Sequence, residues 1–164
     1  MQDWVRLAGM ELIQGSQSKD GRTEIWNRGG ERRYFIGVME GYFVVTSSDR
    51  MAAEKFHLGA LTMELLEKYL YGHFGGSVRK ARRLPRVQKP FRRDELKHGF
   101  RIEEVVFAGQ QEDALLDPAG LIVAIAADDR LVELSHYVEA SSDVIRDSFL
   151  DPEGSPLFAV FSSN

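Results

Sequence analysis

The sequence predicts a single α+β domain, residues 1–164, in which one antiparallel sheet packs against two main helices. Segments rich in aromatic and β-branched residues alternate with turn residues in the first 50 positions, as in an antiparallel meander. Two longer segments carry apolar residues at helical spacing. No repeat and no linker divides the chain, and its 164 residues are enough for one apolar core.

The first 50 residues are expected to form a short helix and a three-stranded meander. Residues 2–9 fit a helix that turns Trp4, Val5 and Leu7 inward and ends at Gly9. We expect strands at 23–27, 33–39 and 42–48, after a polar turn at 15–21 and with connecting turns at 28–31 and 40–41.

The rest of the chain is expected to alternate between helices and strands. Apolar residues from Phe56 to Leu70 follow a spacing of three and four, which predicts a helix from about 52 to 74 that stops at Gly75-Gly76. A second helical pattern starts at Asp128-Asp129, and Ser141-Ser142 is a point at which it would divide in two. We expect further strands at 99–109, 121–127 and 157–161.

Charge is unevenly distributed along the chain. Residues 79–98 contain nine Lys and Arg and two Asp and Glu, whereas the remainder contains 12 basic and 23 acidic residues. A basic strip of net charge +7 is thus attached to a body of net charge −11. The strip fits either a solvated connection, punctuated by Pro85 and Pro90, or an electrostatic footprint for nucleic acid. The acidic balance of the whole chain favours the first interpretation.

The composition limits the cellular compartments and the kinds of chemistry that are expected for this chain. There is no cysteine, so the chain forms no disulfide and has no thiol chemistry. The N-terminus lacks a signal-peptide pattern, and the longest apolar run, residues 121–127, is far shorter than the roughly 20 residues of a membrane span. We therefore expect a soluble cytoplasmic protein.

No arrangement of residues typical of an enzyme or a metal site is apparent. The four histidines do not have metal-ligand spacing, and their expected roles are packing or surface ones, with His57 and His73 on the long helix. Glu103 and Glu104 are neighbours on an expected strand and so point to opposite faces. The serines lack a nucleophile-elbow pattern. We accordingly expect no catalytic residue, no metal and no cofactor.

The segment Gly109-Gln110-Gln111-Glu112-Asp113 is the most distinctive polar stretch between apolar segments. One interpretation is a solvated hairpin or bulge loop with Gly109 at an unusual φ. The other is a binding loop. Glutamine carboxamides carry the planar C=O and NH2 pair that a nicotinamide also carries, and the two carboxylates resemble the phosphates of a dinucleotide in charge. Such a loop would suit the cleft of an NAD-consuming enzyme.

Three stretches, residues 26–50, 66–87 and 135–158, resemble the immunity protein 61 family of actinobacterial polymorphic-toxin systems. The resemblance implies a non-enzymatic antitoxin. Its implied partner is a cognate secreted NAD(+) glycohydrolase toxin domain, bound one-to-one in the producer's cytosol with its NAD site covered. No family motif fixes the contact surface, so the assignment of toxin binding to residues 109–113 comes from their chemistry.

Two other classes of function compete with the antitoxin. The first is a regulatory or nucleic-acid-binding module that uses the basic residues between 79 and 93. The second is a small enzyme whose site is assembled from scattered residues. For the antitoxin, the preferred interpretation, we expect neither nucleic acid nor membrane as a partner.

Overall fold

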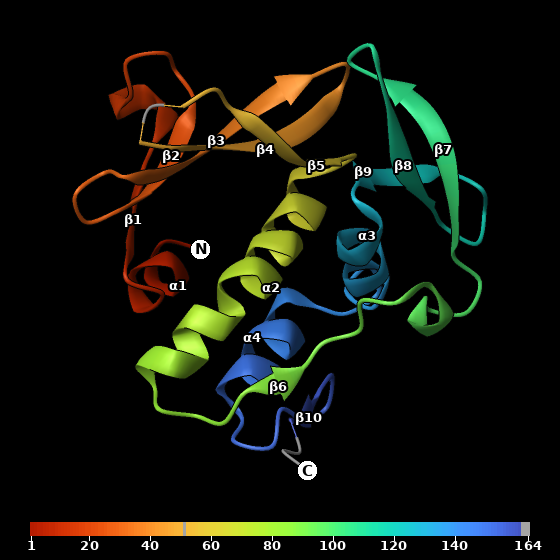
Figure 1. The fold of residues 1–164 in the computed structure, drawn as a ribbon. Helices are drawn as coiled ribbons and strands as arrows, with labels where there is room; N and C mark the ends of the chain where they lie inside the picture. The colour runs from red at the N-terminus through yellow and green to blue at the C-terminus, as the bar shows by residue number, and fades with distance from the viewer. Residues whose placement is uncertain (51, 162–164) are drawn as a thin grey trace.

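Eight antiparallel strands form one continuous sheet in the computed structural model, which describes residues 1–50 and 52–161 (Figure 1). Their order across the sheet is β1–β2–β3–β4–β5–β9–β8–β7. The expected fold class, α+β with an antiparallel sheet, is confirmed. The strands are β1 (Met10–Ile13), β2 (Thr23–Asn27), β3 (Arg32–Met39), β4 (Tyr42–Asp49), β5 (Lys55–Ala60), β7 (Arg101–Phe107), β8 (Gln110–Leu116) and β9 (Ile122–Ala126).

The α-helices of the described residues lie on one side of this sheet (Figure 1). They are α1 (Gln2–Leu7), α2 (Met63–Ala81), α3 (Asp128–Ser135) and α4 (Ser142–Leu150). A small sheet of β6 (Val87–Gln88) and β10 (Ala159–Val160) lies at the end of the molecule farthest from the large sheet. None of these helices is both long and apolar enough to cross a bilayer.

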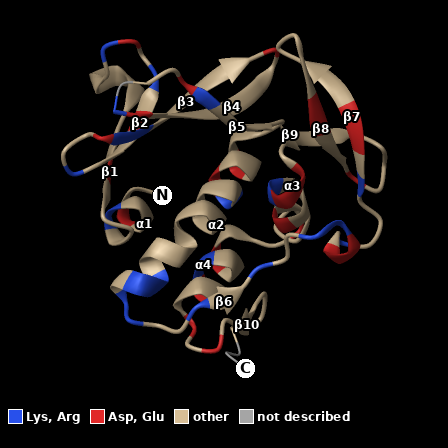
Figure 2. Cartoon of the chain, viewed as in Figure 1, with Lys and Arg blue, Asp and Glu red and all other residues tan. Residues whose placement is uncertain are grey.

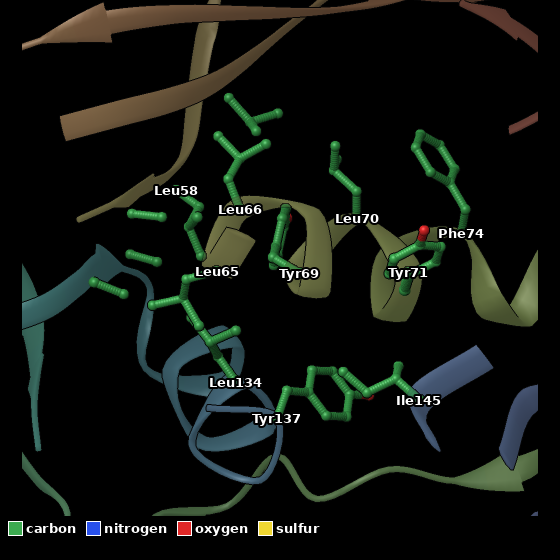
Figure 3. Close-up of a cluster of buried hydrophobic side chains, with 14 of the residues drawn as sticks. Leu58, Leu65, Leu66, Tyr69, Leu70, Tyr71, Phe74, Leu134, Tyr137 and Ile145 are labelled. Carbon is green, nitrogen blue, oxygen red and sulfur yellow. The ribbon is translucent and has the colours of Figure 1, made fainter. Parts of the chain in front are cut away.

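The main apolar core lies between α2 and the large sheet (Figure 3). Leu66 and Leu70 of α2 are fully buried, as is Leu58 of the facing strand β5. Leu134 of α3 and Ile145 of α4 extend the same cluster on the other side of α2. Each such side chain contributes about 1.5–3 kcal/mol by burial, so the core fixes the sheet to its helices and gives the exposed hairpins a firm support.

Most of the predicted elements are present. The strands expected at 23–27, 33–39, 42–48, 99–109 and 121–127 correspond to β2, β3, β4, β7 and β9. The helix expected at 2–9 is α1, with Trp4 and Val5 buried. The C-terminal helical pattern divides where predicted, since the side chain of Ser141 caps α4 by accepting a hydrogen bond from the Val144 N–H at 3.2 Å. The strand expected at 157–161 is reduced to β10.

The predicted start of the long helix is wrong. Residues 55–60 form β5, a strand between β4 and β9, so His57 lies on the sheet. The helix α2 begins only at Met63, after Thr62 accepts a hydrogen bond from the Leu65 N–H at 3.2 Å. The side chains of Leu58 and Ala60, two residues apart, face the core from a strand, whereas the spacing of Phe56, Ala60 and Met63 imitates a helix.

The predicted end of the long helix is also wrong, because α2 continues through Gly75-Gly76 to Ala81. The glycines of α2 serve helix packing. A Cβ on Gly72 would lie 2.6 Å from the Tyr137 ring, and one on Gly75 would overlap the Phe149 ring of α4. Glycine therefore permits a close approach of the two helices here and does not end α2.

Candidate functional site

The segment 109–113 is a turn only at its first residue. Ala108 and Gly109, at φ of 50° and 76°, form the two-residue turn between β7 and β8. Both angles lie in the left-handed region that such tight hairpin turns require, so the expected role of Gly109 is confirmed. Gln110 to Asp113 instead open strand β8 and pair with β7, which corrects the expectation of a projecting five-residue loop.

Because neighbouring residues of a strand point to opposite faces, the four polar side chains of the segment divide into two pairs. Gln111 and Asp113 share the face of the buried Leu115, on the helix side of the sheet. Gln110 and Glu112 share the opposite face with Ala114. The carboxylates and amides therefore do not converge on one point as a single plug.

The helix-side pair is already engaged within the protein. Gln111 donates a hydrogen bond through Nε2 to the Glu104 carboxylate across the hairpin, at 3.0 Å. Asp113 lies 3.6 Å from the guanidinium of Arg93, which also contacts Asp128 at 2.9 Å. Of the predicted site residues, Gly109 and Gln110 at the exposed tip remain best placed to enter a partner's cleft.

A second hairpin tip lies beside this one (Figure 1). Glu40 and Gly41 turn the chain from β3 to β4, and a carboxylate oxygen of Glu40 accepts a hydrogen bond from the Ala108 N–H at 3.2 Å. The rings of Tyr42 and Phe107 meet edge to face at 5.7 Å between centroids. We call residues 38–42 and 106–111 together the paired tips.

The paired tips expose aliphatic side chains that a folded monomer usually covers. Val38 is 70% exposed, Met39 39% and Val106 79%. Exposed aliphatic residues within a polar and charged surround are typical of protein-binding surfaces. Val38 and Met39 are not among the site residues predicted from the sequence, although two apolar residues directly before a Glu-Gly turn are a local signal for them.

The charges separate along the molecule (Figure 2). Acidic residues gather on β7 and β8 next to the paired tips, among them Glu103, Glu104 and Glu112. Basic residues gather at the far end of α2 and along the chain toward β6. The tips therefore expose Val38 and Val106 on the helix-side face and Met39 on the opposite face, within acidic surroundings that are complementary to a basic cleft.

A buried cluster between the sheet and α2 contains two of the histidines. The rings of His57 and His73 lie 5.8 Å apart between centroids, and His57 Nε2 lies 2.6 Å from the hydroxyl of Ser47. Burial, reinforced by nearby positive charge, lowers the pKa of His57 to about 4 and that of His73 to about 3. A general base at neutral pH needs a pKa near 7, so this serine–histidine pair is suited to packing and not to proton transfer.

The described residues contain no group of three or more side chains that could hold a metal ion. His136 lies outside the cluster of His57 and His73 and forms a hydrogen bond with the carbonyl of Glu95 at 2.8 Å. The arrangement that stands out chemically is therefore the protein-binding character of the paired tips.

Comparison with known proteins identifies the relatives of the chain. The family model described as immunity protein 61 matches residues 4–157. The immunity factor for TNT from Mycobacterium tuberculosis (strain ATCC 25618 / H37Rv) is 55% identical over 161 residues, which are 98% of this chain and 92% of that protein. An immunity factor for TNT homolog from Mycobacterium bovis (strain BCG / Pasteur 1173P2) matches to the same extent.

A solved structure agrees with these sequence matches. Rv3902c from M. tuberculosis superposes with a TM-score of 0.93 at 56% identity, covering 98% of this chain and 92% of the other. The resemblance read from the sequence is confirmed. The comparisons do not test which residues contact a partner, so the assignment of residues 109–113 stays a prediction.

Proposed function

The chain belongs to the immunity protein 61 family, and on that premise we propose that it is an antitoxin. It binds a cognate secreted NAD(+) glycohydrolase toxin domain in a one-to-one complex, blocks the NAD-binding site and protects the producing mycobacterial cell. The observation that carries this proposal is 55% identity over nearly the full length to proteins named as immunity factors for a toxin.

The paired tips are the surface we assign to the toxin. Gly109 and Gln110 enter the cleft, where the Gln110 carboxamide occupies the hydrogen bonds that would hold the nicotinamide amide. Glu112 lies on the same face of β8 as Gln110 and meets basic groups that would hold phosphate. Gln111 and Asp113 support this arrangement through their contacts with Glu104 and Arg93.

The exposed aliphatic residues supply the apolar part of the same interface. Met39 shares the face of Gln110, whereas Val38 and Val106 lie on the helix-side face of the tips, so a cleft that encloses both faces removes all three from water. The turn at 15–21 is not part of this interface, because Gln17, Ser18 and Lys19 border a hollow with Trp26 and Arg33, toward the other end of β3 (Figure 1). The paired tips suit an interface of roughly 1,600 Å².

The turn at 27–31 lies at the opposite end of β3 from the paired tips. The eight residues of β3 separate the two by roughly 27 Å, at about 3.4 Å per residue. We therefore leave this turn out of the proposed interface.

Inhibition of this kind needs no catalysis by the antitoxin. The protein acts by occupying the toxin's site in the cytosol of the cell that makes the toxin. The lowered pKa of His57 and its packing in the core are consistent with a non-enzymatic role.

Competition with a fluorescent NAD(+) analogue tests the site-blocking part of the proposal. The analogue is first bound to a catalytically inactive toxin domain, and the chain is then titrated in. We expect stoichiometric displacement. A ternary complex that retains the analogue would show that the chain binds the toxin somewhere other than the NAD site.

The second candidate function, a regulatory or nucleic-acid-binding module, rests on the exposed basic side chains between residues 79 and 93 (Figure 2). Binding to a generic DNA duplex that weakens steeply with salt would favour it. Weak or undetectable duplex binding at physiological salt would leave the antitoxin as the function of the chain.

A further inference from the structure

A pocket of about 460 Å³ lies at the C-terminal end of α2, where this acidic protein concentrates its positive charge (Figure 2). Its volume is within the range of small-molecule sites. The exposed cations around it are Lys80, Arg83 and Arg86, and its apolar wall includes Leu84 and Val87. The pocket is at the opposite end of the molecule from the paired tips (Figure 1).

The wall of the pocket is held by the buried guanidinium of Arg79. This group donates hydrogen bonds to the carbonyls of Pro85 at 2.6 Å, Phe149 at 3.0 Å, Asp151 at 2.6 Å and Pro152 at 2.9 Å. It joins the end of α2 to the end of α4 and to the segment after α2. The pocket is therefore a built feature of the fold, and Arg79, with four of its five N–H donors engaged by carbonyls, is a positioning residue.

The three exposed cations have no carboxylate partner among the described residues, and the Arg86 guanidinium lies 6.0 Å from the centroid of the Phe161 ring. The salt bridges among residues 1–50 and 52–161 engage other cations, such as Lys89 with Glu133 at 2.8 Å, and include none of Lys80, Arg83 or Arg86. The carboxylate of Asp151 nearby is occupied by the backbone N–H groups of its own turn. Three cations without carboxylate partners around one hollow favour a multiply charged anion.

Two residues at this pocket depart from what the local backbone favours. Arg83 has φ of 59°, at the position after a helix end where the Leu84 N–H bonds the Arg79 carbonyl and glycine is the usual residue. Gly76 lies inside α2, yet a Cβ there would meet nothing within 4 Å. No packing contact explains this glycine, in contrast to Gly75.

Both departures are explained if the pocket is occupied by a ligand. Arginine at position 83 supplies a planar donor fork, and glycine at position 76 keeps the wall open where any side chain would project into the hollow. Local rules are commonly broken at functional sites for such reasons.

We infer that this pocket binds a small phosphorylated molecule, with the phosphate on Lys80, Arg83 and Arg86 and a planar or apolar body against Leu84 and Val87. The concave shape favours a small molecule over a polymer. The net charge of −11 on the rest of the chain opposes the close approach of a long polyanion such as nucleic acid. The site is separate from the proposed toxin surface and does not depend on that proposal.

Calorimetric titration of the full chain tests the inference with three probes: adenosine diphosphate, pyrophosphate and adenosine. We expect saturable one-to-one binding of adenosine diphosphate, weaker binding of pyrophosphate and none of adenosine. Absence of saturable binding by both phosphorylated probes at millimolar concentration would overturn the inference. Tight, steeply salt-dependent binding of a short DNA duplex at the same residues would overturn it in favour of a nucleic-acid surface.

Two variants separate a specific site from general charge attraction. Arg83→Gly removes the cation and relieves the backbone, so the fold is retained while the affinity for adenosine diphosphate falls by about tenfold or more. Gly76→Leu fills the hollow without altering charge and lowers the affinity to a similar extent. Arg82→Ala, an exposed neighbour outside the pocket, is the control and leaves binding unchanged. Equal losses in all three variants would refute a defined pocket.

Discussion

The carboxylate of Glu40 accepts a hydrogen bond from the backbone N–H of Ala108 at 3.2 Å, which joins two hairpin tips 68 residues apart in the sequence. The contact of Tyr42 with Phe107 directly beneath it holds the same tips together. The two hairpins therefore present one surface in a fixed arrangement, which reduces the ordering cost of binding a partner.

Replacing Glu40 by alanine removes the acceptor and releases the tips from each other. Because the bond is exposed, the free energy of unfolding should change by less than about 1 kcal/mol, while the toxin complex should weaken by roughly 1–2 kcal/mol. Thermal unfolding and calorimetry measure the two quantities. Glu31→Ala, at the opposite end of β3, is the matched control. Equal affinities for the two variants would mean that the tips do not act together.

The two glutamines of the predicted site should contribute unequally to toxin binding. Gln110 lies at the exposed tip, whereas Gln111 is engaged by Glu104. We expect Gln110→Ala to cost at least about 2 kcal/mol of binding free energy and Gln111→Ala to cost less. Gln88→Ala in β6 serves as the control in the same affinity measurement. If Gln110→Ala binds as tightly as the wild type, the glutamine mechanism is wrong even if the chain remains an antitoxin.

Substitution by alanine should change the stability of the protein in opposite directions at the neighbouring glycines Gly75 and Gly76 of α2. Gly75→Ala places a methyl group into the Phe149 ring and should destabilise the protein by about 1–3 kcal/mol. Gly76→Ala meets open space and should stabilise it by up to about 1 kcal/mol, since alanine is the better helix former. Urea unfolding of the two variants checks both signs. A stabilised Gly75→Ala variant would contradict the close packing of α2 on α4.

Stability should fall as the pH drops from about 6.5 toward about 4, because of His57 and His73. Burial lowers their pKa values to about 4 and about 3 in the folded protein, whereas an unfolded histidine titrates near 6.5. In this window the unfolded chain binds more protons, and each extra proton lowers the free energy of unfolding by about 1.4 kcal/mol per pH unit.

Urea unfolding at a series of pH values between 7.5 and 5 measures this slope. His73→Phe keeps an aromatic ring against Tyr69 and Tyr34 but removes one titrating group, so its slope should be shallower than that of the wild type. A slope that is unchanged in the variant would show that His73 is not excluded from protonation in the folded state.

Much of the fold could be predicted from local pattern, and the errors have physical causes. The strands of the first meander alternate clearly and were found. The sequence predicts a helix over residues 55–60 because Phe56, Ala60 and Met63 follow helical spacings of four and three, and only pairing with β9 decides for a strand. Gly75 resembles a helix end because the sequence signal is local, whereas the reason for the glycine is contact with the Phe149 ring, 74 residues away in the chain.

The candidate site could be predicted only in part, because some of its features depend on contacts between residues that are distant in the sequence. Chemistry alone singled out Gly109 to Asp113, and the turn at Gly109 is confirmed. The partnership with Glu40 and the exposure of Val38 depend on tertiary structure that brings two distant hairpins together. The strand that Gln110 opens also divides the four polar side chains between two faces, which a loop would not have done.

The most direct test of the central claim is NAD(+) consumption by the candidate toxin domain, titrated with this protein. The proposed antitoxin predicts that activity falls linearly and reaches zero at one equivalent, with a one-to-one complex on a sizing column. Undiminished NAD(+) consumption at large molar excess, with no complex on the column, would contradict the antitoxin function for that toxin.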